Sequence, residues 1–162
     1  MKRIIIWGFA IIFIIIIGVY FLKPKRSIIN ETITTIIFKI ISQMKIISVF
    51  QNNEKIPEKY TCRGKDINPP LKIENIPQKT QSLVLIIDDP DAPNGTWIHW
   101  MVANIDPNTA IIAENSVPQD AVQGKNSWGK IAYGGPCPPS DTHRYFFKIY
   151  ALDQKLDLKE GF

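Results

Sequence analysis

Acidic side chains that could orient a base or hold a metal gather at one point in the second half of the chain. The stretch DDPDAP at residues 88–93 follows an apolar run and alternates Asp89 and Asp91 with prolines. Proline holds φ at about −65° and restricts the residue before it, so we expect a stiff, extended turn. Two carboxylates that are two residues apart in such a turn can point the same way.

Both histidines of the chain lie in or beside predicted strands. His99 interrupts the apolar run 97–105, and His143 precedes the apolar run 144–152, with Tyr145 two residues further on. Side chains two apart in a strand share a face, so His143 and Tyr145 can present two donors to one oxyanion. The alternative for His99 is a hydrogen-bonded core residue.

A third stretch, YGGPCPP at residues 133–139, contains paired glycines, which allow close backbone approach and expose N–H groups. Histidine N–H, tyrosine O–H and glycine N–H groups are donors that suit a phosphate-like anion. We expect Asp89 to orient one histidine and to favour its charged form. Anion binding should then weaken as the pH rises through the histidine pKa values.

Two alternatives use the same residues for other chemistry. A hydrolase could use Cys137 as its nucleophile and His143 as the base. A metal ion could take His99, His143, Asp89 and Asp91 as ligands, although no compact His-x-x-x-His spacing supports this site. We expect neither, and predict a protein that is not an enzyme and uses no metal or cofactor.

The two cysteines, Cys62 and Cys137, are too few for a disulfide scaffold and lack Cys-x-x-Cys spacing. One bridge between them would close a loop of about 75 residues and stabilise the fold by about 4 kcal/mol in the chain-entropy account. Two buried thiols are the alternative, and the sequence leaves both open.

The chain from residue 44 onward is typical of a β domain, because Pro, Gly and Asn separate short apolar runs. The predicted strands are 46–50, 71–74, 82–87, 97–105 and 144–152. We therefore predict an all-β fold, a two-sheet antiparallel β-sandwich over residues 44–162.

The N-terminal segment differs in composition. Ile4 to Leu22 is nineteen residues without a charge, which approaches the thickness of a bilayer core of about 30 Å. We predict a transmembrane anchor at 1–27, in a single-pass membrane protein whose orientation is undecided, with the periplasmic side favoured. A secretory signal peptide is the alternative, but no small-x-small cleavage pattern follows. Residues 28–43 carry isoleucines at helical spacing and predict an amphipathic juxtamembrane helix.

The distribution of charge argues against one class of partner. Residues 1–43 contain six of the 19 basic residues and one of the 15 acidic residues, so the rest of the chain is nearly neutral. No basic stripe remains after that separation, and we expect no nucleic-acid partner.

Several blocks in order resemble the signature motifs of the phosphatidylethanolamine-binding protein family, in its bacterial and archaeal, Raf-kinase-inhibitor-like branch. The blocks are DDPDAP, the following W-x-H-W, and GGPCPP leading into HRY. They are supported by YTC at 60–62 with Gly64, by Asp66 with NPPL at 68–71, and by Asn126 with Gly129 ahead of Tyr133. The resemblance covers about Met44 to Leu152. It implies a β-sandwich with a small pocket for phosphate-like anions, lined by Asp89, Asp91, His99, Gly135, Pro136, His143 and Tyr145.

Members of that family usually continue for several dozen residues beyond the strand at 144–152, so the resemblance also implies a C-terminally shortened domain. We expect a membrane-anchored protein that binds a small anion, such as phosphate or phosphoethanolamine, and that could act as a regulator. The alternatives are an inhibitor that binds a kinase or protease, with a protein partner that is unknown, and a truncated member that binds no ligand.

Overall fold

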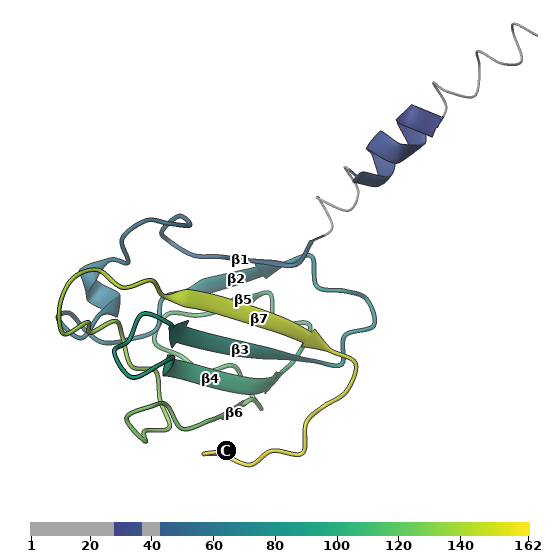
Figure 1. Ribbon diagram of the computed structural model, residues 1–162. Coiled ribbons are helices and arrows are strands. Elements are labelled where there is room, and N and C mark those ends of the chain that lie inside the picture. The colour runs from purple at the N-terminus through teal and green to yellow at the C-terminus, as the bar shows by residue number, and fades with distance from the viewer. Residues whose placement is uncertain (1–27, 37–42) are drawn as a thin grey trace, which may run out of the picture. The chain divides into compact units, whose positions relative to one another are not determined.

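The computed structural model describes residues 28–36 and 43–162, and the chain divides into two compact units, Met1–Gln43 and Met44–Phe162. In the first unit, residues 28–36 are helical and their side chains are exposed. The second unit is a β domain made of two sheets (Figure 1). This β domain contains all the candidate site residues.

Both sheets of the β domain are antiparallel. The smaller sheet has the order β1-β2-β5, with strands Lys45–Ile47, Leu71–Glu74 and Ile111–Ile112. The larger sheet has the order β6-β4-β3-β7, with strands Val122–Gln123, Trp97–Ile105, Ser82–Asp89 and Phe146–Leu152. A 3-10 helix, η1 (Glu58–Tyr60), lies in the long connection between β1 and β2.

The hydrophobic core is organised around β3, the strand between β4 and β7. Leu83, Leu85 and Ile87 alternate along β3 and are at most 1% exposed. They pack with side chains of β2, β4 and β5, among them Leu71 and Trp100. Full burial of a side chain of this size stabilises the fold by about 1.5 to 3 kcal/mol. A slip of one residue would turn this whole series away from the core, so the core fixes the register of β3.

The predicted strands agree with the structure most closely where the apolar run is long. The ranges predicted for β2 and β4 are confirmed, whereas β3 extends two residues further, because Asp88 and Asp89 still pair with β4. β7 begins at Phe146, two residues later than predicted. β5 and β6 were not predicted, because two residues are too few to show a periodic pattern.

The predicted transmembrane helix and single-pass membrane location are corrected. Among residues 28–36 and 43–162, no helix is long and apolar enough to cross a membrane. The helical stretch 28–36 rises only about 14 Å at about 1.5 Å per residue and includes Asn30 and Glu31. The segment Ile4 to Leu22, on which the prediction depended, lies outside the described residues. The fold that the structure supports is the two-sheet β domain, and neither the membrane span nor the periplasmic side is retained.

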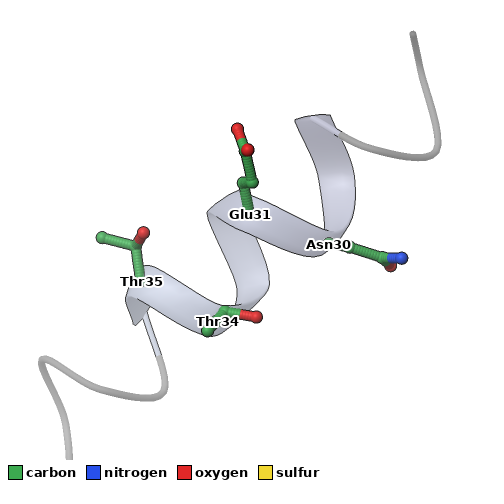
Figure 2. A pocket seen from close by; sticks show the side chains of 4 residues that line it. All are labelled: Asn30, Glu31, Thr34 and Thr35. Atoms are coloured by element: carbon green, nitrogen blue, oxygen red, sulfur yellow. The ribbon is translucent and has the colours of Figure 1, made fainter.

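An open surface hollow lies along the helical residues of the first unit. It is lined by Asn30, Glu31, Thr34 and Thr35 (Figure 2). Figure 2 shows these side chains pointing outward from one helix and not toward a common centre. A ligand there would meet a single exposed helix, so we do not treat the hollow as a site.

Candidate functional site

The candidate residues of the β domain lie at one end of the larger sheet. Figure 1 shows the end of β3, the start of β4, the segment leading into β7 and η1 on the same side of the domain. Because β3 is antiparallel to both neighbours, its last residues lie beside their first ones: Asp89 pairs with Trp97 and Asp88 with Phe146. The topology therefore brings the DDPDAP, W-x-H-W and HRY blocks together.

Asp89 orients His143. Asp89 continues the inward-facing alternation of β3, and its side chain is only 5% exposed. Its Oδ2 lies 2.7 Å from Nδ1 of His143, and its Oδ1 accepts the backbone N–H of Asp91 at 2.8 Å. A carboxylate that accepts both bonds leaves the proton on Nδ1 of the imidazole. The second ring nitrogen of His143, Nε2, is the one left for a ligand, and the side chain keeps 10% of its surface exposed.

His99 occupies a β-bulge in β4. Ile87 pairs with Trp100 and Asp88 pairs with Ile98, so His99 is the extra residue between two regular pairs. A bulge of this kind turns a side chain away from the direction that simple alternation gives it. The sequence predicted the strand but carried no signal for the bulge.

The His99 ring carries its proton on Nδ1, so its second nitrogen is an acceptor and not the N–H donor expected from the sequence. Its Nδ1 lies 2.7 Å from the carbonyl oxygen of Gly134, and a carbonyl accepts, so Nδ1 carries the proton. Burial lowers the pKa of His99 below its ordinary value, although the backbone of Gly134 and Gly135 and the charge of Asp89 oppose that shift. The ring is therefore neutral at pH 7, with an unprotonated Nε2.

The paired glycines do not expose their N–H groups, which corrects a second expectation. Gly134 donates its N–H to the backbone oxygen of His99 at 3.0 Å, and Gly135 donates to Oδ1 of Asp66 at 2.6 Å. A Cβ on Gly135 would lie 2.4 Å from the backbone oxygen of Tyr60. The glycine is needed for close approach between two loops, and neither amide is left to bind an anion.

A disulfide joins these two loops. Cys62 and Cys137 are bonded, with their Cα atoms 5.5 Å apart. Cys62 also donates its N–H to the oxygen of Pro136 at 3.2 Å, and the Tyr133 hydroxyl donates to the oxygen of Tyr60 at 2.8 Å. Because its sulfur is in the bridge, Cys137 has no thiol to act as the nucleophile of the hydrolase alternative.

Asp91 is engaged by Arg144, a residue that the sequence analysis did not single out. Arg144 donates Nη2–H to Oδ1 of Asp91 at 2.6 Å, Nε–H to Oδ2 at 2.9 Å and its backbone N–H to Oδ2 at 2.8 Å. These bonds hold the pKa of Asp91 well below its usual range. Asp91 therefore fastens the turn after β3 to the segment before β7.

Among the residues that the structure describes, no group of three or more His, Cys, Asp or Glu is arranged to hold a metal ion.

Aromatic rings connect the buried His99 side chain to the protein surface. His99 lies edge-on to Tyr145, with ring centroids 5.2 Å apart, and edge-on to Trp128 at 5.1 Å. Trp128 in turn lies 5.3 Å from Trp97. His99 is 2% exposed whereas Trp128 is 43% exposed, so the accessible part of this group lies at Trp128 and His143. Neither tryptophan was predicted as a site residue, although Trp97 could have been found from its position in the W-x-H-W block.

Two hydrogen-bond donors in this group are buried without a partner among the described residues. They are the hydroxyl of Tyr145 and Nε1 of Trp97. Burial raises the pKa of Tyr145 to about 12, and the charge of Asp89 adds to the rise. The backbone of Cys137 acts in the opposite direction and lowers the pKa of Tyr145. Tyr145 therefore keeps its proton and remains a donor at neutral pH.

An antiparallel β-sandwich with a histidine, carboxylate and tyrosine cluster at the ends of its central strands defines the class of this protein. The family model described as phosphatidylethanolamine-binding protein matches residues 46–162. The chain belongs to the phosphatidylethanolamine-binding protein family, which confirms the resemblance seen in the sequence.

Several similar proteins agree with that assignment. A UPF0098 protein of Pyrococcus horikoshii is 53% identical over 126 residues, covering 73% of this chain and 64% of that protein. A UPF0098 protein of Methanothermobacter thermautotrophicus is 48% identical over 117 residues, covering 69% and 78%. The chain thus spans less than two thirds of the length of the first relative.

Two solved structures have the same fold. A putative phosphatidylethanolamine-binding protein homologue from Chlamydia trachomatis superimposes with a TM-score of 0.71 at 44% identity, covering 75% of this chain and 82% of the other. YbcL of Escherichia coli, described as a member of the mammalian family, gives a TM-score of 0.69 at 29% identity, with coverage of 73% and 82%.

Proposed function

We propose that the β domain binds a small oxyanion, a phosphate or a phosphate monoester head group, beside His143, Tyr145 and Trp97. The observation that carries the proposal is the pair of buried donors on Tyr145 and Trp97. A buried polar group without a partner costs about 1 to 3 kcal/mol, and such groups are rare in folded proteins. Phosphate oxygens would supply the missing acceptors. The protein would act by binding, not as an enzyme.

In both imidazoles the proton lies on Nδ1, and this arrangement of donors and acceptors favours one protonation state of the ligand. Neutral His99 offers a lone pair at Nε2, so it suits a ligand hydroxyl group, and the nearby Asp89 carboxylate opposes added negative charge. A phosphate monoanion has both acceptor oxygens and P–O–H groups. We expect binding to weaken as the pH rises above about 6, where phosphate monoesters lose their second proton.

The experiment is a titration of the full chain with inorganic phosphate and with phosphoethanolamine, followed by calorimetry. His143→Ala should lower the affinity about tenfold or more, because a hydrogen bond to a charged group contributes about 1.5 to 3 kcal/mol. Asp141→Asn is the matched control, since Asp141 is exposed and lies two residues from His143. Equal affinity in all three proteins, or no saturable phosphate binding by the unmodified chain, would refute the proposal.

The inhibitor that binds a kinase or protease stays a prediction, and no contact in the β domain favours it over the anion site. A phosphoethanolamine affinity well above that of inorganic phosphate would identify a head group as the ligand. Equal affinities would identify the phosphate group alone as the recognised part.

A further inference from the structure

One peptide bond connects the candidate site to a carboxylate outside it. The carbonyl of Gly134 accepts Nδ1–H of His99 at 2.7 Å, and the N–H of the next residue, Gly135, donates to Oδ1 of Asp66 at 2.6 Å. This carbonyl and this N–H belong to the same planar peptide unit, so the direction of one sets the direction of the other. Asp66 therefore contacts His99 through a single rigid group.

That peptide unit needs an external constraint. It lies between two glycines, which have no Cβ to restrict φ and ψ, so the local backbone does not by itself fix the direction of its plane. A flipped peptide would present its N–H group toward His99 and would require an unprotonated Nδ1. Because an ionised carboxylate only accepts hydrogen bonds, Asp66 holds the N–H on its own side and the carbonyl on the side of the ring.

Asp66 is itself held in place to make this contact. Its φ of 54° lies in the left-handed region, which Asp tolerates better than most residues. The bridge between Cys62 and Cys137 keeps its loop against the glycine segment, and a Cβ on Gly135 would lie only 2.8 Å from Oδ1 of Asp66. A bond from an amide to a carboxylate is charge-assisted and polarises the peptide, which strengthens its carbonyl as an acceptor.

We propose that Asp66 is a positioning residue of the site, which locks the Gly134–Gly135 peptide and so keeps His99 in the tautomer protonated at Nδ1. Its effect on a ligand rests on the proposed function, because it determines that Nε2 of His99 is an acceptor for a protonated phosphate oxygen. Its effect on the tautomer does not depend on any ligand. The two effects can therefore be tested separately.

The first experiment measures the ring nitrogens of His99 by NMR of the ¹⁵N-labelled full chain without ligand. The chain has two histidines, so His143→Gln assigns the signals. Asp66→Gly removes the carboxylate while glycine accepts the positive φ without strain. We expect the His99 ring to change from one tautomer to a mixture in Asp66→Gly, and to stay as in the unmodified chain in Asp66→Asn, which keeps an acceptor oxygen.

Glu114→Gln is the control, because Glu114 also binds this loop, by accepting the Tyr60 hydroxyl at 2.8 Å, but does not contact the glycine peptide. Its His99 tautomer should match the unmodified chain. An unchanged tautomer in a folded Asp66→Gly protein, or the same change in Glu114→Gln, would overturn the inference. Amide spectra establish that each variant is folded. If Asp66→Asn changed the His99 tautomer as completely as Asp66→Gly does, that result would also overturn the inference.

The second experiment titrates the same proteins with inorganic phosphate. Asp66→Gly should bind about three- to tenfold more weakly, the loss expected for one neutral hydrogen bond, and Asp66→Asn should recover most of the affinity. If the unmodified chain does not bind phosphate, the proposed function fails while the tautomer measurement still decides the role of Asp66. Equal affinity in Asp66→Gly and the unmodified chain would overturn the ligand part of the inference.

Discussion

Nδ1 of His143 lies 2.7 Å from Oδ2 of Asp89, although 54 residues separate them in the chain. The contact exists because β7 pairs with β3 in antiparallel fashion, which returns the segment before β7 to the end of β3. The carboxylate determines which ring nitrogen is protonated and leaves Nε2 for a ligand. The pairing of two strands thus sets the hydrogen-bonding polarity of the candidate site.

Removing the hydroxyl of Tyr145 should affect stability and binding in opposite directions. In the free protein, Tyr145→Phe removes a buried donor without a partner, so the free energy of unfolding should rise by about 1 to 2 kcal/mol. Phosphate affinity should fall, because the same hydroxyl is proposed to bind the anion. Urea denaturation without phosphate and calorimetry with it measure the two effects. A variant that loses stability and keeps its affinity would show that the hydroxyl has a structural partner instead.

The stability of the protein should decrease as the pH falls below about 6.5, through the lowered pKa of His99. In that range the unfolded chain takes up a proton on this imidazole that the folded protein does not, so acid favours unfolding. One such group contributes a slope of at most about 1.4 kcal/mol per pH unit.

Urea denaturation from about pH 8 to about pH 5, on the unmodified chain and His99→Asn, isolates this contribution. The carboxylates of Asp89 and Asp66, whose charges act on the ring, are present in both proteins. The difference in unfolding free energy between the proteins should shrink as the pH falls. A constant difference over this range would show that the pKa of His99 is not lowered.

The bridge between Cys62 and Cys137 should be a large single contribution to stability. It spans a separation of 75 residues. Closing a loop of that length stabilises the folded state by about 4 kcal/mol in the chain-entropy account. We expect dithiothreitol to lower the unfolding free energy by about 2 to 4 kcal/mol, since both cysteines are exposed. The double variant with alanine at both positions should be as unstable as the reduced unmodified chain and should not respond to dithiothreitol. If dithiothreitol destabilised that variant too, the bridge would not be the cause of the effect.

The long strands could be predicted because their local pattern is sufficient. Residues 97–105 form β4 as the apolar run indicates, and the series Leu83, Leu85 and Ile87 faces the core as alternation requires. The strands β5 and β6 have no such pattern, because they exist only through pairing with β2 and β4. The transmembrane prediction came from composition alone and concerned residues outside the described part of the chain.

The amino-acid sequence by itself determined which chemical groups the site contains, because the motifs name Asp89, His99, His143 and Tyr145. The strand order, which the tertiary structure sets, brings them to one end of the larger sheet. Only the tertiary structure decided how those groups are used. In the folded protein Asp91 binds Arg144, the N–H of Gly135 donates to Asp66, and Nδ1–H of His99 donates to the carbonyl of Gly134. The partner of a polar atom depends on contacts between residues far apart in the chain, and a local pattern of residue types does not record them.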